Sequence, residues 1–312
     1  MQPKSLSLIM LLILSSLLVS SCFKKDLSVA KLKSKYTNGE SQFTMIEGMN
    51  VHYRDEGNER APCILFLHDT GSSLHSYEKW ADTLKLSYRV LRLDLPGFGL
   101  TGPHPSRDYS MKMYRDFLDI FLADMGAKKC YVVGTGLGGR LAWELTLAYP
   151  KRVRRMVLIG AMGFPLDKKH QTPLEKIAKG SSTSKLYFKK FTPKKAIKRT
   201  VYQNHSDEKS VTKEQIDRQS DLLRRKGNRK AFIDRMAQED YNRTRRLRDI
   251  EIPVLLAWGT DDKIVPIDHA SYFHKLFPNS KVKMYPKMGH LISEEKNGKP
   301  IIDLMDFLDY RK

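Results

Sequence analysis

The chain has 312 residues, with 55 Lys and Arg against 35 Asp and Glu, a formal net charge of +20, and three cysteines. That length permits a substantial hydrophobic core, in one large domain or two smaller ones. The basic charge makes nucleic acid a candidate partner, but the sequence has no recognition-helix motif, zinc framework or aromatic RNA-binding signature. Three widely spaced cysteines are also too few to bind a metal ion. We therefore expect no nucleic-acid partner, metal or cofactor.

The first 21 residues have the layout of a secretory signal peptide. Lys4 precedes an uncharged run rich in leucine and isoleucine, from Leu6 to Val19, and small residues follow it. An ordinary cleaved signal and a retained membrane helix are the alternatives, but spanning a bilayer takes about 20 predominantly apolar residues. We predict a signal peptide over residues 1–21 and an exported protein.

The end of this signal, Val19-Ser20-Ser21-Cys22, resembles the lipobox of bacterial lipoproteins. The resemblance implies cleavage before Cys22 and diacylglycerol on its thiol, so that the membrane is a partner through lipidated Cys22. Phe23, rather than aspartate, follows the cysteine, and this by resemblance favours the outer membrane if the cell has two membranes. The protein would then face the periplasm or the cell exterior. Residues 22–41 are rich in lysine without a strong apolar period and predict a solvated tether.

After the tether, apolar runs of strand length alternate with helical patterns. This pattern is typical of a mostly parallel sheet with helices on both faces, an α/β fold. A helix is expected from Ser110 to about Met125, and another from Leu137 to Tyr149, stopped by Pro150. Both Cys63 and Cys130 begin a buried strand and are expected to be structural thiols. The expected strands are Val51–Arg54, Cys63–Leu67, Val90–Leu93, Cys130–Val133, Met156–Ile159, Val254–Trp258 and Val282–Tyr285.

The strand pattern stops between Phe164 and Ile250, where a basic stretch of helix-forming residues contains 24 Lys and Arg against 11 Asp and Glu. We predict an inserted helical cap over residues 164–249, with breaks at Pro173, Pro193 and Gly227. Its lysine-rich surface is interpreted as a solvated helical face, with a dedicated anion-binding face as the alternative.

The segment Val133-Gly134-Thr135-Gly136-Leu137-Gly138-Gly139 predicts a sharp turn from a strand into a helix. In a GxSxG nucleophile elbow the central residue presents its side chain above the sheet, and the next backbone N–H helps to form an oxyanion hole. Here the central residue is Gly136, which has no side chain. The same glycines also satisfy a dinucleotide-binding fingerprint, but no acidic residue follows the next strand near Gly160, as that fingerprint requires.

Taken in order, five motifs resemble those of the α/β-hydrolase superfamily, in particular its capped esterase-like, epoxide-hydrolase-like and proline-iminopeptidase-like branch. This resemblance implies an eight-stranded, mostly parallel sheet, a core over residues 42–163 and 250–312, and a cap over residues 164–249. The motifs are the loop Leu67–Ser73, the turn Asp94–Gly99, the elbow at Gly136, the segment Trp258–Asp262 with Pro266, and Gly289-His290 followed by Glu294 and Glu295.

The resemblance also implies a role for each site residue. His290 would be the base, Asp262 rather than Asp261 would orient it, and Gly136 stands at the nucleophile position. The backbone N–H groups of Thr70 and Leu137 would form the oxyanion hole.

A second departure from the family pattern is Asp69, where glycine is usual. A carboxylate there opposes the stabilisation of negative charge unless it turns away or pairs with a cation.

These departures predict a pseudo-hydrolase that binds a small molecule or a partner in the former active-site pocket. The alternative is an active hydrolase or lyase in which the His290–Asp262 pair acts as general base on water or on substrate without a covalent intermediate. Thr135, Ser72 and Ser73 are the candidate substitute nucleophiles.

Overall fold

The computed structural model describes residues 26–238, 242–296 and 298–309. The predicted signal peptide and Cys22 lie outside these residues. Among the described residues, no helix is both long enough and apolar enough to cross a membrane.

One eight-stranded sheet organises the fold, in the order β1-β2-β4-β3-β5-β6-β7-β8. The pairs β1·β2 and β2·β4 are antiparallel, and every other neighbouring pair is parallel. All seven expected strands are present, and β1 is an eighth that the sequence pattern did not indicate. The strands are β1 (Ser41–Ile46), β2 (Met49–Glu56), β3 (Cys63–Leu67), β4 (Arg89–Leu93), β5 (Cys130–Thr135), β6 (Val153–Ile159), β7 (Val254–Gly259) and β8 (Ser280–Tyr285).

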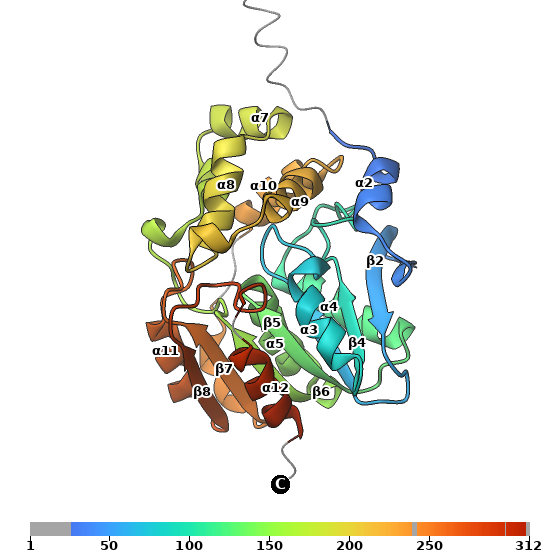
Figure 1. Ribbon diagram of the computed structural model, residues 1–312, viewed down its shortest axis with the longest axis vertical. Coiled ribbons are helices and arrows are strands. Elements are labelled where there is room, and N and C mark those ends of the chain that lie inside the picture. The colour runs from blue at the N-terminus through green and yellow to red at the C-terminus, as the bar shows by residue number, and fades with distance from the viewer. Residues whose placement is uncertain (1–25, 239–241, 297, 310–312) are drawn as a thin grey trace, which may run out of the picture.

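Helices cover both faces of the sheet (Figure 1). On one face, α3 (Glu78–Leu84) and α12 (Lys299–Asp309) share a buried apolar cluster with the strands. On the other face, a larger cluster contains α4 (Met111–Asp124), α5 (Leu137–Ala148) and α11 (Asp268–Leu276). Because the central strands are apolar on both sides, they require this double cover. The predicted architecture is confirmed.

The expected helix after Ser110 is α4, and its local sequence explains both its start and its buried face. The Ser110 hydroxyl accepts a hydrogen bond from the Met113 amide, which caps the first turn. Tyr114, Phe117 and Phe121 recur at helical spacing and are fully buried. The helix therefore packs one apolar stripe against the sheet.

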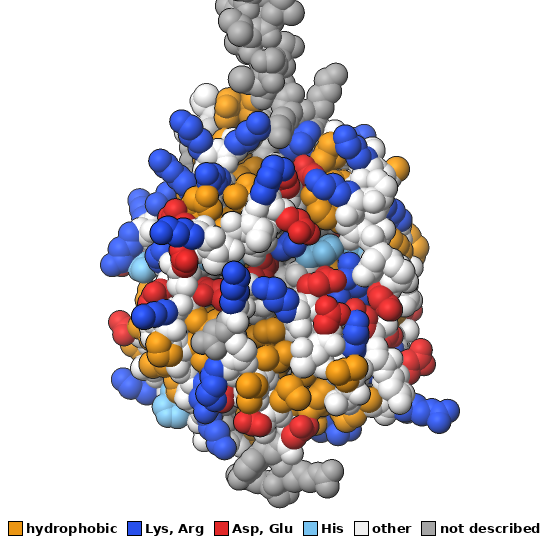
Figure 2. Space-filling view, in the orientation of Figure 1, with side chains coloured by type: hydrophobic (Ala, Val, Ile, Leu, Met, Phe, Trp, Pro, Cys, Tyr) orange, Lys and Arg blue, Asp and Glu red, His pale blue; other side chains and the backbone are white. Residues whose placement is uncertain are grey.

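Five helices lie between β6 and β7, in the region predicted as the cap. The predicted breaks at Pro173, Pro193 and Gly227 coincide with helix starts: Pro173 is the first residue of α6, and the other two are the N-caps of α8 and α10. Figure 2 shows Lys and Arg side chains spread over this end of the molecule. The helices are α6 (Pro173–Lys179), α7 (Ser182–Lys190), α8 (Lys194–Gln203), α9 (Lys213–Leu223) and α10 (Asn228–Ala237). The short 3₁₀ helices among the described residues are η1 (Leu74–Tyr77), η2 (Pro150–Arg152), η3 (Lys168–His170), η4 (Glu208–Ser210) and η5 (Thr244–Asp249).

The prediction of a solvated tether over residues 22–41 is wrong for its described part. Residues Val29–Tyr36 form helix α2, which buries Leu32 and Tyr36. Lys35 and the Tyr36 hydroxyl both bind the Asp221 carboxylate of α9, at 2.7 and 2.9 Å. Four apolar residues interspersed with three lysines give a weak periodic signal, and contacts with the cap rather than local propensity hold this helix in place.

A buried ion pair links the antiparallel strands β2 and β4 to each other and to helix α3. The guanidinium of Arg92, which is fully buried, donates to both oxygens of Glu56 at 2.6 and 2.9 Å and to Glu78 at 2.8 Å. Such a pair is costly to break because the remaining charge keeps its desolvation penalty.

We expect Arg92→Met to lower the free energy of unfolding by about 3 to 5 kcal/mol, since Glu56 would be left buried without its cation. Chemical denaturation of the variant measures this loss. The control is the double variant Arg92→Met/Glu56→Met, which should recover much of the stability. Equal losses in the single and double variants would contradict the assignment of the effect to the stranded carboxylate.

Candidate functional site

The turn between β5 and α5 centres on Gly136, at φ 53° and ψ −112°. Its N–H donates to the Ile159 carbonyl at 3.1 Å, and its carbonyl accepts from the Arg140 and Met162 amides. Residues with a side chain are strained at this positive φ. A Cβ on the nearby Gly138 would lie 1.9 Å from the Leu67 carbonyl oxygen, so that glycine allows α5 to approach β3. The strand–turn–helix geometry expected at the elbow is present.

The side chain above this turn belongs to Asp69, in the loop after β3. A Cβ built on Gly136 would lie 2.0 Å from Asp69 Oδ1, so the carboxylate fills the space in which a side chain at position 136 would begin. Asp69 Oδ1 also accepts a hydrogen bond of 2.7 Å from the Leu137 amide, one of the two predicted oxyanion donors. The other, Thr70, lines the cavity beside Asp69. Asp69 has therefore not turned away from the site.

Asp69 instead pairs with His290. The His290 Nε2 atom lies 3.3 Å from Asp69 Oδ2, and its Nδ1 lies 2.8 Å from Asp262 Oδ2. The other oxygen of Asp262 accepts from the Ile264 and Val265 amides. The imidazole is fully buried between the two carboxyl groups. The structure thus joins Asp262 to His290, as the motif spacing predicts, and adds Asp69 on the opposite side of the ring.

This arrangement favours a protonated imidazole. Burial alone would lower the pKa of His290, but the carboxylates of Asp262 and Asp69 outweigh burial and raise the pKa to about 10. Two acceptors facing the two ring nitrogens can both be satisfied only when both nitrogens carry a proton. At neutral pH the ring is then a cation and not a free general base.

The same shift predicts how stability depends on pH. The folded-state pKa of His290, about 10, lies above its ordinary value of 6.5. The contribution of this group to the free energy of unfolding is therefore fully present below pH about 6.5 and is lost as pH rises towards 10. We expect the urea midpoint to fall over that window. In Asp69→Asn the fall should be smaller, since one carboxylate that holds the proton is gone. Parallel falls in the two proteins would contradict the pairing.

The cap holds the His290 loop in place. The backbone carbonyl of Asn204, at the end of α8, accepts from the amides of His290 and Leu291 at 2.9 and 3.1 Å. Glu295 accepts from the Gly289 and Ser206 amides at 2.6 and 3.1 Å. Sequence reasoning missed Asn204 because a backbone contact from an inserted helix leaves no motif.

Gly160, at the end of β6, is a second residue that the sequence did not reveal. Its φ is +47°, and a Cβ there would lie 2.7 Å from both Asp262 Oδ2 and His290 Nδ1. Its lack of a side chain therefore makes room for the pair. The sequence signal that could have identified Gly160 as a site residue is its position directly after the central strand β6.

A cavity of about 170 Å³ opens beside Asp69 and His290. Burial raises the pKa of the one glutamic acid that lines it, Glu175. Within the described ranges, no group of three or more His, Cys, Asp or Glu is arranged to hold a metal ion. The cavity is lined by Asp69, Thr70, Met162, Phe164, Leu166, His170, Gln171, Glu175, Lys179, Ile264 and His290.

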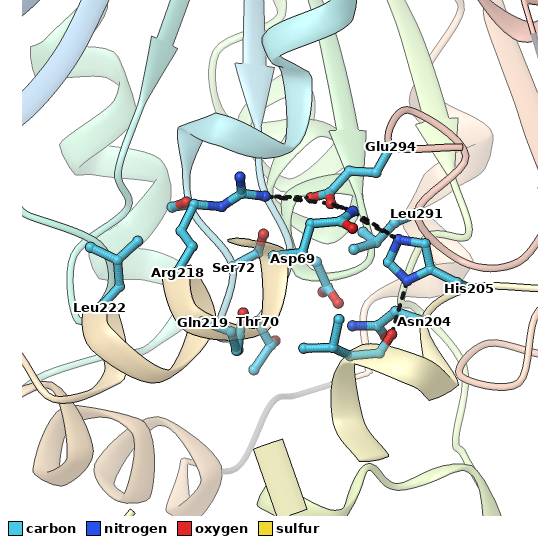
Figure 3. A pocket seen from close by; sticks show the side chains of 13 residues that line it. Asp69, Thr70, Ser72, Asn204, His205, Arg218, Gln219, Leu222, Leu291 and Glu294 are labelled. Atoms are coloured by element: carbon cyan, nitrogen blue, oxygen red, sulfur yellow. Dashed lines mark hydrogen bonds and ion pairs between the residues drawn. The ribbon is translucent and has the colours of Figure 1, made fainter. Parts of the chain in front are cut away.

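On the other side of Asp69, a small polar crevice separates α9 from the loop after β3 (Figure 3). Glu294 lines it, and its carboxylate lies 2.6 Å from the Gln215 amide and 3.4 Å from Arg218. These contacts bind the cap to the core next to the site, so the crevice is a contact between the two parts rather than an open pocket.

The candidate substitute nucleophiles are bonded elsewhere. Thr135 Oγ1 lies 2.7 Å from the Tyr77 hydroxyl, Ser72 Oγ lies 2.5 Å from Ser76 Oγ, and Ser73 Oγ lies 3.2 Å from His75 Nδ1. Asp69 is the side chain that faces His290 Nε2.

Comparison with known proteins gives the family. The α/β-hydrolase fold model matches residues 62–297. The chain belongs to the α/β-hydrolase family. The uncharacterized hydrolase YugF of Bacillus subtilis is 26% identical over 80% of this chain and 91% of its own length. A 2-hydroxy-6-oxononadienedioate/2-hydroxy-6-oxononatrienedioate hydrolase of Paraburkholderia phymatum is 26% identical over 88% of this chain and 95% of its own. A solved membrane phospholipase A, titled a bacterial virulence factor, shares the fold with a TM-score of 0.75 at 20% identity, over 97% of each chain.

Proposed function

We propose that this α/β-hydrolase is a pseudo-hydrolase, which binds a small molecule in the cavity beside Asp69 and His290 and performs no serine acyl transfer. The observation that carries the proposal is that the Asp69 carboxylate lies 2.7 Å from the Leu137 amide and 3.3 Å from His290 Nε2. The named relatives are hydrolases, which supports descent from an enzyme.

Three consequences of this carboxylate argue against acyl transfer. Gly136 offers no nucleophile, and in a triad enzyme the loss of the serine alone lowers turnover by about a millionfold. The Leu137 amide already donates to a carboxylate, whose charge opposes a developing oxyanion. His290, with a pKa of about 10, carries its proton at neutral pH. This last point also disfavours the alternative in which His290 is a general base on water.

The absence of acyl transfer is tested with p-nitrophenyl acetate and a fluorophosphonate probe. We expect hydrolysis at the rate of the buffer, equal in the wild type and in His290→Gln, and no labelling by the probe. Hydrolysis that His290→Gln abolishes, or an adduct on Asp69, would overturn the proposal.

Ligand binding in the cavity is tested by native mass spectrometry of the protein taken from its own cells. We expect a bound small molecule in the wild type and none in Leu166→Trp, which fills the cavity that Leu166 lines. Leu86→Trp is the matched control, since Leu86 is 83% exposed between α3 and β4 and does not line the cavity. Equal ligand in the wild type and both variants would contradict binding in this cavity.

We further propose that the mature protein is an exported bacterial lipoprotein, held to a membrane by diacylglycerol on Cys22, on the outer membrane where the cell has two. The lipobox-like Val19–Cys22 supports this. Mass spectrometry of the N-terminal peptide should find the thioether-linked lipid, and Cys22→Ser should remain unmodified.

A further inference from the structure

Helix α7 lies at the outer end of the cap (Figure 1), and two neighbouring apolar residues on it are exposed to solvent. Leu186 and Tyr187 are 58% and 50% exposed, whereas the next residue, Phe188, is fully buried and packs against Phe232 of α10 at 5.9 Å between ring centroids. The Phe191 ring stacks on Tyr187 at 4.3 Å. Phe188 therefore fixes the helix, and its exposed pair is held in an ordered position.

Lysines surround this pair. Residues 176–206 contain nine Lys and Arg and no Asp or Glu. Lys189, Lys190, Lys194 and Lys195 are exposed, and in the described part of the chain none of the four forms an ion pair. We call Lys185, Leu186, Tyr187, Lys189 and Lys190, with Lys194 and Lys195, the α7 face. Leucine and an aromatic ring among unpaired lysines are the composition of surfaces that lie in the headgroup region of anionic bilayers.

The described chain begins beside this face. Arg229 of α10 pairs with the Asp26 carboxylate and donates to the Thr192 hydroxyl, two residues after α7, at 3.2 Å. The amide of Leu27 also donates to the Arg224 carbonyl at 2.8 Å. Three residues separate Asp26 from Cys22, and four Cα–Cα steps span at most about 14 Å. A lipid on Cys22 would therefore bring this end of the cap to the membrane.

We propose that the α7 face is a docking surface for an anionic lipid bilayer, with Leu186 and Tyr187 in the headgroup region and the lysines at the lipid phosphates. The exposed apolar pair and the unbalanced positive charge carry this inference, and they do so independently of the pocket and its ligand. Each lysine at an anionic surface raises membrane affinity by about fivefold.

The test places a nitroxide label at position 186 of the full-length protein, through Leu186→Cys, on vesicles of phosphatidylcholine with and without phosphatidylglycerol. The matched control is Leu86→Cys, another exposed leucine, which precedes β4 at the end of the sheet opposite the cap. Cys63 and Cys130 are buried, and burial raises the pKa of the Cys63 thiol to about 12, so neither competes for the label.

On anionic vesicles we expect the label at 186 to lose accessibility to a water-soluble nickel chelate and to gain accessibility to oxygen, because it moves from water into the headgroup region. The label at 86 should not change. Lys189→Glu/Lys190→Glu should return the label at 186 to water. Equal chelate accessibility at 186 and 86 on vesicle-bound protein would overturn the docking face, as would a failure to respond to anionic lipid.

These outcomes separate the docking face from the anchor at Cys22. Protein that sediments with vesicles while its label at 186 stays in water overturns the face and leaves the anchor standing. Cys22→Ser protein, which carries neither the lipid nor a competing thiol at position 22, should still bury the label at 186 on anionic vesicles if the face binds on its own.

Discussion

Gly136→Ser alone is expected to give no esterase activity, whereas Gly136→Ser/Asp69→Gly is expected to give a serine esterase. A Cβ at position 136 would lie 2.0 Å from Asp69 Oδ1, so a serine cannot occupy this turn until the carboxylate moves. The single variant also places a side chain at a φ of 53°, a strain of about 1 to 3 kcal/mol. It should lose stability without gaining function.

Removing the Asp69 carboxylate also changes two other parts of the site in ways that favour catalysis by a serine. The Leu137 amide, which now donates to Asp69 Oδ1, becomes free to stabilise an oxyanion. One of the two carboxylates that raise the pKa of His290 is also lost, so the ring can accept the serine proton nearer to neutral pH. The three triad groups and one oxyanion donor would then stand together.

The measurements are p-nitrophenyl acetate hydrolysis and fluorophosphonate labelling, with the modified peptide identified by mass spectrometry. We expect the double variant to exceed the buffer rate by about 10³-fold or more, a fraction of the millionfold that a full triad contributes. Asp69→Gly alone is the control and should remain inactive. Full activity in Gly136→Ser alone would show that Asp69 does not obstruct the turn.

The sequence predicts the sheet and the individual site residues, but it does not show which of these residues lie next to one another in the fold. Gly136 and Asp69 are 67 positions apart, and each is visible as a departure from the family pattern. The parallel neighbours β3 and β5 bring the loops that follow them to the same edge of the sheet, where one carboxylate takes the place of the missing side chain. Whether Asp69 turned away or paired with a cation depended on His290, 221 residues further along the chain.

The features that sequence reasoning missed are held by contacts distant in sequence. Helix α2 depends on the cap through Asp221, and the His290 loop depends on the Asn204 carbonyl. Neither contact leaves a periodic pattern or a motif, since one links two remote polar side chains and the other involves a backbone carbonyl that any residue has. The α4 helix, by contrast, carries its cap and its apolar stripe in its own sequence, and α5 ends just before Pro150.

His290→Ala is expected to lower the free energy of unfolding by about 3 to 5 kcal/mol, because it leaves the carboxylates of Asp69 and Asp262 facing an empty, buried space without the cation between them. Under the proposed function, the imidazolium is a structural ion that is bonded on both nitrogens, rather than a catalytic base. Thermal and urea denaturation at pH 7 measure the loss.

Two variants separate charge from volume as the cause. His290→Gln has an amide that can donate to only one of the two carboxyl groups and carries no charge, so it should fill most of the space yet still lose stability. His290→Ala/Asp69→Gly removes one of the opposed carboxylates and should be more stable than His290→Ala, although it has the larger cavity. If stability instead followed side-chain volume alone, the double variant would be the least stable of the three. That result would show that the ion triplet of Asp69, His290 and Asp262 does not stabilise the loops at this edge of the sheet.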